Sequence, residues 1–236
     1  MKFETLETLE NRRLFSVSVE QGYPGYFEVY GDDSANVIAV SVSASGSSFT
    51  LDGVTYGGVS YISVFAFAGD DTVSVVLDGD SPIGASIDAG PGDDDATIVG
   101  SGAIWGQSGN DTIRLSDSFR AEAYGGPGDD KIRVSGRSAD PEISGGPGDD
   151  RIDASECAFG VYAHGDQGND IIYGSNGDDQ LYGDSGSDLL LGNGGNDMFS
   201  AEDGERDRIA GGAGIDIAYT DADEAGIWGV EYVFYV

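Results

Sequence analysis

The sequence predicts an all-β solenoid, in which the chain winds into stacked coils of short strands and turns. Three observations lead to this prediction. Residues 165–219 repeat a unit of nine residues almost without interruption, a glycine returns at the fourth place of each unit, and a large apolar residue usually returns at the eighth. Repetition at a short fixed period indicates units that bury their apolar faces only by stacking on their neighbours.

The residue types within each repeat predict a turn followed by a strand. From Gly165 it reads GDQGNDIIY, GSNGDDQLY, GDSGSDLLL, GNGGNDMFS, a ten-residue copy AEDGERDRIA, and GGAGIDIAY. The first six residues are short, polar and rich in glycine, which suits a tight turn. The last three alternate polar, apolar and polar, as in a strand with one buried face. One copy therefore makes half a coil, and two copies return the chain to the same side.

The sixth place of the repeat is aspartate, and this predicts a cation site. Equivalent turns of successive coils stack at the strand spacing of about 4.8 Å. Calcium takes six to eight oxygen ligands at about 2.3–2.6 Å, which two stacked turns supply from carbonyls and carboxylates. We expect each sixth-position aspartate to lie near the ion above it and the ion below it.

Composition points the same way. The 236-residue chain has a formal net charge of −32, and self-repulsion of this size destabilises a compact state unless cations bind among the carboxylates. The charge argues against nucleic acid or an anionic membrane as partner. The single cysteine excludes an internal disulfide, and no apolar run approaches the roughly 20 residues of a membrane-spanning helix.

Taken in order, the chain begins with two segments outside the regular repeat. Residues 1–16, MKFETLETLENRRLFS, resemble the LEPRxLL-type N-terminal motif of some large secreted surface proteins, with Asn11 where that motif has proline. A sorting segment and a frayed or disordered terminus are the two interpretations. Residues 17–68 alternate like strands but lack good calcium turns, and Asn36 stands where the repeat has aspartate. We interpret this region as an N-terminal β cap.

Residues 69–164 carry the repeat at about double spacing. The fourth-position glycines Gly69, Gly92, Gly109, Gly128, Gly148 and Gly168 are separated by 23, 17, 19, 20 and 20 residues. Apolar residues two places before these turns belong to the opposite strand: Ile87, Ile104, Ala123, Ile143 and Ala163. This pattern predicts full coils with calcium on one side only. Residues 165–219 then carry calcium on both sides, and residues 220–236 form a C-terminal cap with Trp228, Val230, Val233 and Phe234 over the last coil.

From about residue 66 to 236 the chain resembles the RTX, or haemolysin-type, calcium-binding family, most specifically in residues 165–219. The resemblance implies a right-handed parallel β-roll, calcium-dependent folding and an extracellular or cell-surface location. It also implies that carbonyls of turn positions one, three and five meet positions two, four and six of the stacked neighbour. Counting the gaps between stacked glycines gives eight ions, and a ninth if Gly69 stacks on Gly92.

Carried onto this chain, the resemblance implies a set of metal-ligating residues drawn from the turns. They are Asp71, Asp93, Asp94, Asn110, Asp111, Gly126, Gly128, Asp129, Asp130, Gly146, Gly148, Asp149, Asp150, Gly165, Gly168, Asn169, Asp170, Gly174, Gly177, Asp178, Asp179, Gly183, Gly186, Asp188, Gly192, Gly195, Asn196, Asp197, Gly204, Asp207, Gly211, Gly214 and Asp216. Three departures weaken the pattern. Ala66 and Phe67 replace the glycine pair before Gly69, one inserted residue near Glu205 shifts the role of aspartate to Asp207, and the 23-residue interval from Gly69 to Gly92 is long enough to break the first stack.

Catalysis has little support in the sequence. A nucleophilic site would have to use His164, the single histidine, and no GxSxG motif occurs. Cys157 is interpreted as a small packed side chain. We therefore expect a protein that is not an enzyme: either a calcium-stabilised structural or surface protein, or a module that binds a polysaccharide or a partner protein. Outward aromatic residues gathered in one column would favour binding.

Overall fold

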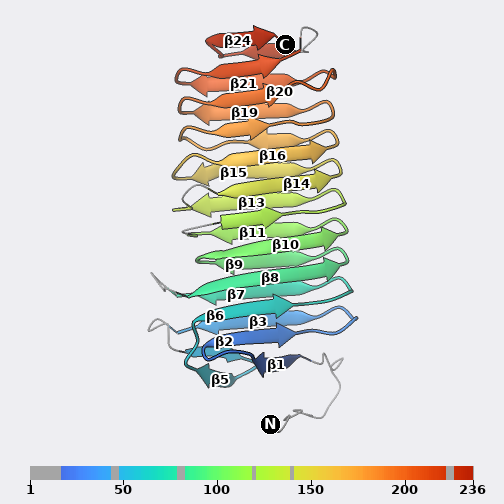
Figure 1. Ribbon diagram of the computed structural model, residues 1–236, viewed down its shortest axis with the longest axis vertical. Helices are drawn as coiled ribbons and strands as arrows, with labels where there is room; N and C mark the ends of the chain where they lie inside the picture. Colours follow the sequence, from blue (N-terminus) through green and yellow to red (C-terminus); the bar gives the residue numbers. More distant parts are fainter. Residues whose placement is uncertain are drawn as a thin grey trace.

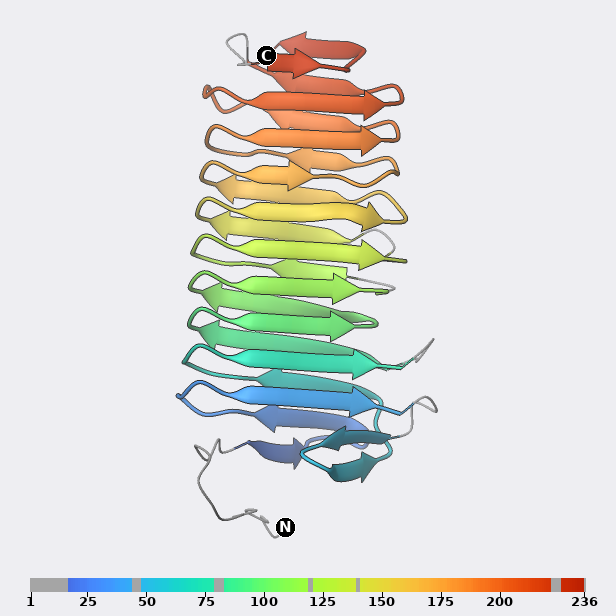
Figure 2. The ribbon, with the colours of Figure 1, turned by 180° about the vertical axis from the view of Figure 1, so that it is seen from behind.

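The chain winds into a stack of coils, whose strands form two facing sheets of twelve strands each (Figures 1 and 2). The computed structural model describes residues 17–43, 48–78, 83–118, 121–138, 141–221 and 226–235, and these contain strands and no helix. The first described strands lie at one end of the stack and the last at the other (Figure 1). The predicted all-β solenoid of parallel stacked coils is confirmed.

The strands alternate between the two sheets. Sheet A contains, in spatial order, β1 (Ser18–Gln21), β2 (Tyr26–Tyr30), β6 (Tyr61–Phe65), β8 (Gly84–Pro91), β10 (Gly102–Ser108), β12 (Ala121–Tyr124), β14 (Glu142–Pro147), β16 (Tyr162–Gln167), β18 (Gln180–Tyr182), β20 (Met198–Ala201), β22 (Ile217–Thr220) and β24 (Tyr232–Tyr235). Sheet B contains β23 (Gly226–Trp228), β21 (Arg208–Ala213), β19 (Leu189–Gly194), β17 (Ile171–Tyr173), β15 (Arg151–Cys157), β13 (Lys131–Gly136), β11 (Thr112–Ser116), β9 (Asp95–Val99), β7 (Thr72–Leu77), β3 (Val37–Val42), β4 (Ser48–Leu51) and β5 (Val54–Gly57).

The N-terminal end departs from the parallel pattern in three strands. β1 runs antiparallel to β2, and β4 and β5 form an antiparallel hairpin on β3. β2 and β3 themselves pair in parallel with β6 and β7, so the first regular coil lies within residues 17–68. Phe49 packs against Phe27 at 5.1 Å and Tyr56 at 4.8 Å between ring centroids, and Phe49 is fully buried there. Residues 1–16 lie outside the described residues, and their sorting role stays a prediction.

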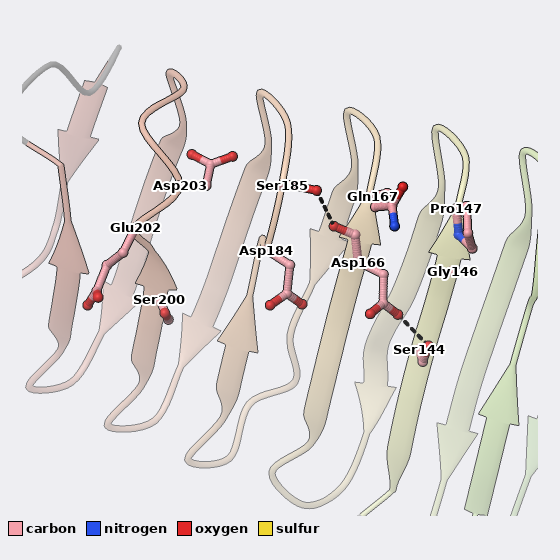
Figure 3. Close-up of a pocket in the computed structure, with 10 residues that line it drawn as sticks. All are labelled: Ser144, Gly146, Pro147, Asp166, Gln167, Asp184, Ser185, Ser200, Glu202 and Asp203. Carbon is pink, nitrogen blue, oxygen red and sulfur yellow. Dashed lines mark hydrogen bonds between the residues drawn. The ribbon is translucent and has the colours of Figure 1, made fainter.

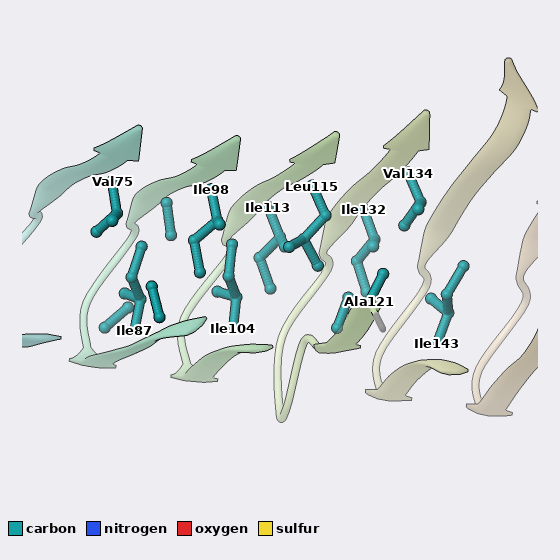
Figure 4. Close-up of a cluster of buried hydrophobic side chains, with 14 of the residues drawn as sticks. Val75, Ile87, Ile98, Ile104, Ile113, Leu115, Ala121, Ile132, Val134 and Ile143 are labelled. Carbon is teal, nitrogen blue, oxygen red and sulfur yellow. The ribbon is translucent and has the colours of Figure 1, made fainter. Parts of the chain in front are cut away.

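The core is a stack of apolar side chains between the sheets (Figure 4). Ile87 lies in register with Ile104 in sheet A, and Ile113 lies in register with Ile132 in sheet B. The eighth-position residues of the strict repeats, Ile172, Leu181, Leu190, Phe199, Ile209 and Ala218, have no exposed surface. The same holds for the apolar residues that precede the turns of the 69–164 region, Ile87, Ile104, Ala123, Ile143 and Ala163. The predicted inward positions are thus confirmed in both regions.

The C-terminal end covers the core only in part as predicted. Val230 and Ile227 pack against the core. Trp228 and Phe234 do not, because they lie in register with the outward residues Ala210 and Tyr219 and remain about half exposed, at 48% each. The strand alternation, which places neighbouring residues on opposite faces, therefore decides which apolar residues close the coil. Among the described residues, no helix has the length and apolar character needed to cross a membrane.

The inward register generates a prediction about Leu181. Replacing this fully buried leucine with aspartate puts an unpaired carboxylate into the apolar stack. We expect the free energy of unfolding in calcium to fall by at least about 3 kcal/mol, the sum of a lost apolar side chain and a buried charge. Denaturant unfolding followed by circular dichroism measures this change.

Gln180→Asp is the matched control, because Gln180 precedes Leu181 on β18 and is exposed. It should change the free energy of unfolding by less than about 0.5 kcal/mol. Equal losses in the two variants would mean that the inward register of the repeat is wrong.

Candidate metal centres

Sixth-position aspartates form two columns of buried carboxylates along the two edges of the ladder. The first column follows the turns from sheet A to sheet B and contains Asp71, Asp94, Asp111, Asp130, Asp150, Asp170, Asp188 and Asp207. The second follows the turns from sheet B to sheet A and contains Asp179, Asp197 and Asp216. All of them are at most 3% exposed. Among the residues that the structure describes, the turns from sheet B to sheet A carry such a buried aspartate only after residue 165.

Each carboxylate ties one coil to the next. The backbone N–H of Asp111 donates to Oδ1 of Asp130 at 2.7 Å, and that of Asp130 donates to Oδ1 of Asp150 at 2.7 Å. The same bond recurs through the first column with donor–acceptor distances of 2.6–2.8 Å between Asp71 and Asp207. In the second column the distance is 2.9 Å at both steps. These bonds fix the sixth-position side chains at the strand spacing.

In most of these aspartates the second carboxylate oxygen, Oδ2, takes no part in the hydrogen bonds between coils. In nine aspartates Oδ2 is buried and has no hydrogen-bond partner: Asp71, Asp94, Asp111, Asp130, Asp150, Asp170, Asp188, Asp197 and Asp216. Leaving a buried charged oxygen without a partner costs several kcal/mol. Protein groups satisfy such atoms almost always. A column of unpartnered carboxylate oxygens is therefore the donor set of a hard cation such as calcium.

Glycine at the first place of the repeat keeps the space beside these oxygens open. A Cβ atom built on Gly145 would overlap Oδ2 of Asp150 and lie 2.8 Å from the carbonyl oxygen of Gly165. The same cradle of one carboxylate oxygen and one carbonyl recurs at Gly106, Gly125, Gly165, Gly174, Gly192 and Gly211. The fourth-position glycines stack as closely, since a Cβ on Gly109 would overlap the carbonyl of Gly92. Glycine is required at both places because two turns approach there.

Burial makes the carboxylates hard to ionise without a cation. Desolvation raises the pKa of Asp150 and Asp188 to about 8, of Asp94, Asp130 and Asp197 to about 7, and of Asp111 and Asp170 to about 6. Accepted backbone hydrogen bonds oppose this rise, and repulsion between neighbouring aspartates adds to it. The pKa of Asp71, Asp179 and Asp216 is raised by burial as well.

The fifth place of the repeat forms a second, exposed ladder beside the first. The backbone N–H of Asn169 donates to Oδ1 of Asp149 at 2.7 Å, and that of Asn196 donates to Oδ1 of Asp178 at 2.7 Å. Asp93, Asn110 and Asp129 continue this pattern. One oxygen of each of these side chains is thus occupied in a bond between coils. For these fifth-position residues, the structure gives a stacking role and no unpartnered buried oxygen.

The two irregular turns differ from each other. A Cβ on Gly92 would overlap the carbonyl of Gly69, so these two turns stack closely despite Ala66 and Phe67. Gly204 is different, because a Cβ there would meet nothing within 4 Å. The N–H of Gly186 donates to Oδ2 of Asp203 at 2.7 Å and not to a backbone carbonyl. The inserted residue is therefore absorbed by an outward loop, while Asp207 keeps its place in the column.

The ends of the columns were not foreseen from the sequence. Asn36 is buried at the start of the first column and its side-chain amide donates to Oδ1 of Asp71 at 3.1 Å. At the end of the second column, Oε2 of Glu231 accepts the N–H of Asp216 at 2.8 Å. Ser175 donates to both oxygens of Asp179, through its N–H at 2.7 Å and its hydroxyl at 2.8 Å. Asn36 replaces an aspartate in the repeat, but no sequence pattern points to Glu231 or Ser175.

Cys157 lies where a small packed residue was expected. It is 3% exposed, its thiol donates to the carbonyl of Val134 at 3.2 Å, and burial raises its pKa to about 12. A thiol in this state is a poor nucleophile at neutral pH.

Fold and turns together define a parallel β-roll whose stacked turns present buried carboxylates to cations. The chain contains four copies of the RTX calcium-binding nonapeptide repeat, matched over residues 99–117, 142–156 and 164–199. Repeats of this kind bind calcium. The comparison with curated proteins found no match to the chain.

The raised pKa values predict how the calcium-free roll responds to pH. In the unfolded chain an aspartate has a pKa of about 3.9, and in the folded roll these pKa values are higher. Protonation of the buried carboxyls therefore stabilises the fold fully at a pH below about 3.9. This stabilisation is lost as the pH rises through the pKa of the folded state. In calcium-free buffer the melting temperature should therefore be highest near pH 4 and fall between pH 5 and 8. Several groups contribute about 1.4 kcal/mol per pKa unit, so the fall should exceed about 10 °C.

Calorimetry across this pH range measures the effect, with calcium-saturated protein as the control. Saturation with calcium should remove most of the dependence, because the ion replaces the proton. A calcium-free melting temperature that does not change from pH 5 to 8 would contradict buried, protonatable columns.

The glycine cradle predicts a difference between two neighbouring substitutions. In Gly192→Ala the new Cβ would overlap Oδ2 of Asp197 and lie 2.6 Å from the carbonyl of Gly211. Gly194→Ala is the control in the same turn, since its nearest atom lies at 3.7 Å. We expect Gly192→Ala to weaken calcium binding in its turn at least about tenfold, as loss of a well-placed ligand does, and Gly194→Ala to leave it nearly unchanged.

Isothermal titration with calcium resolves the loss of one site from the total. Equal effects of the two alanines would show that the space at the first position is not where calcium binds.

Proposed function

We propose that this protein is a calcium-stabilised structural or cell-surface protein whose roll folds when calcium enters the stacked turns. The observation that carries the proposal is the column of buried, unpartnered Oδ2 atoms beside first-position glycines. A group that binds only the folded state adds its binding free energy to folding. The role of calcium is thus to complete the fold. No site for chemistry on a substrate is required for it.

The stacking of fourth-position glycines supports eight sites. Six gaps in the first column are closely stacked, from Gly69 to Gly186, and two in the second column join Gly177, Gly195 and Gly214. The gap between Gly186 and Gly204 lacks this contact. The sixth-position aspartates would supply the carboxylate oxygens, and the first-position residues would supply carbonyls. Eight calcium ions would halve the formal net charge of −32.

An extracellular location follows from the expected affinity. Calcium modules outside cells bind with dissociation constants of about 10⁻⁴–10⁻³ M. A roll with such sites would be occupied outside a cell and largely empty in a cytosol with low calcium. It would therefore fold after export.

Calcium titration tests the proposal. Chelator-treated protein at pH 7.5 should show little ordered structure over residues 165–219 and gain the β spectrum on addition of calcium, with a midpoint of about 10⁻⁴–10⁻³ M. Circular dichroism follows the transition, magnesium at equal concentration is the control, and equilibrium dialysis counts the bound ions. A complete β spectrum with an unchanged melting temperature in chelator would overturn calcium-dependent folding.

A second candidate function is binding of an uncharged polysaccharide, and one observation favours it. A single outward column runs along sheet A and is mostly aromatic. It contains, in register, Tyr30, Phe65, Asp88, Trp105, Tyr124, Ser144, His164, Tyr182, Ser200, Tyr219 and Phe234. Trp105 and Tyr124 are parallel within 10°, with centroids 6.0 Å apart. Flat aromatic faces in a row suit stacking with the C–H faces of successive sugar rings.

A hollow of about 440 Å³ beside Trp105 supplies polar partners, among them Ser63, Ser86, Asp88 and Gln107. The test compares alanine variants of the two tryptophans of the chain, which are screened on a glycan array in the presence of calcium. Trp105→Ala should lower binding of any retained glycan at least about tenfold, while Trp228→Ala, which is outward on sheet B, should not. Binding unaffected by Trp105→Ala would remove the column as the binding surface.

A further inference from the structure

A cluster on the outer face of sheet A uses carboxylates other than those of the two buried columns. His164 and Asp166 come from β16, and Asp184 follows β18 on the next coil. One potential ligand atom of each, a ring nitrogen of His164 and a carboxylate oxygen of each aspartate, lies within 4.8 Å of both others. Figure 3 shows Asp166 and Asp184 on neighbouring coils, facing the same hollow. The parallel register, in which His164 lies opposite Tyr182, brings these three residues together.

Neighbouring side chains hold the imidazole in position. The ring of His164 stacks on Tyr182 with centroids 4.4 Å apart and an interplanar angle of 5°, and Tyr162 lies at 4.9 Å. Nδ1 of His164 is 2.6 Å from Oδ2 of Asp184. The side chains of His164 and Asp184 are 26% and 38% exposed, so an ion can reach them from solvent. The imidazole therefore has little rotational freedom to lose on binding.

The second carboxylate is held as well. Oδ2 of Asp166 accepts a hydrogen bond from the hydroxyl of Ser144. The backbone carbonyl of Asp166 accepts a second hydrogen bond, from the hydroxyl of Ser185 at 3.2 Å. Hydrogen bonds from neighbouring residues to ligating carboxylates orient many metal sites. A hollow of about 730 Å³ adjoins the cluster, with Ser200, Glu202 and Asp203 on its far side. This space leaves room for a water molecule on a bound ion.

We propose that His164, Asp166 and Asp184 form a site for Zn²⁺ on the outer face of the roll. One imidazole nitrogen and two carboxylate oxygens are a mixed donor set that zinc binds, and three protein ligands plus water complete its tetrahedron. Calcium prefers six to eight oxygen ligands, so an imidazole in the set favours the transition-metal ion. On binding, zinc takes the place of the contact between Nδ1 of His164 and Oδ2 of Asp184.

The single histidine makes the test specific. Calcium-saturated full-length protein is titrated with Zn²⁺ by calorimetry, and the imidazole proton resonances are followed by NMR. We expect one zinc ion per chain and a shift of the imidazole resonances that saturates at one equivalent. His164→Gln and Asp184→Asn should each raise the dissociation constant at least about tenfold. Glu142→Gln, which removes one carboxylate from the same face at β14, is the control and should leave it unchanged.

Three results would overturn the site: no saturable binding below about 1 mM zinc, binding that His164→Gln leaves intact, or imidazole resonances that do not move. The second result would assign zinc to the calcium turns, and the third would mean that the His164–Asp184 contact is only a hydrogen bond. Circular dichroism in calcium checks that each variant is folded. If a variant does not fold, the imidazole resonances of the unchanged protein still decide the question.

Discussion

Buried carboxylates stacked along each column at the strand spacing are the constraint on which this structure depends. Oδ1 of each aspartate joins two coils through a backbone N–H, so the side chain cannot turn away to solvent. At an effective dielectric near 20, two like charges 4 Å apart cost about 4 kcal/mol, and a domain is stable by only about 5–15 kcal/mol. The columns therefore hold together only when a proton or a cation takes up the charge.

The ends of the columns and the glycines satisfy the same constraint by different means. At the first coil Asn36 supplies the amide that fits the ladder but adds no charge. At the last coil no further aspartate follows in the column, and Glu231 accepts the backbone N–H of Asp216 in its place. Glycines at the first and fourth places keep side-chain atoms out of the space between turns, where carboxylate and carbonyl oxygens converge. The stability of the roll and the spacing of its coils thus depend on the same few positions.

The outward faces of the two sheets are free of this constraint and differ in chemistry. Sheet B carries Arg114 beside Asp95 and Arg133 beside Glu156, exposed pairs that contribute little to stability. Sheet A carries the aromatic column and the cluster around His164. A roll made rigid by its turns presents such side chains in straight rows, since each coil repeats the last at one strand spacing.

The sequence by itself determined the inward and outward positions, such as Leu181 and Gln180, and the sixth-position aspartates, because a period of nine with strand alternation leaves one arrangement. The one-sided arrangement of calcium in residues 69–164 stays a prediction. Only the tertiary structure decided that Gly69 stacks while Gly204 does not, because an inserted residue can be absorbed in the turn or shift the strand. It alone brought Asp184 beside His164 and turned Trp228 outward, since contacts between coils depend on register across 18 or more residues. The residues next to a given position do not determine which residue of the neighbouring coil it contacts.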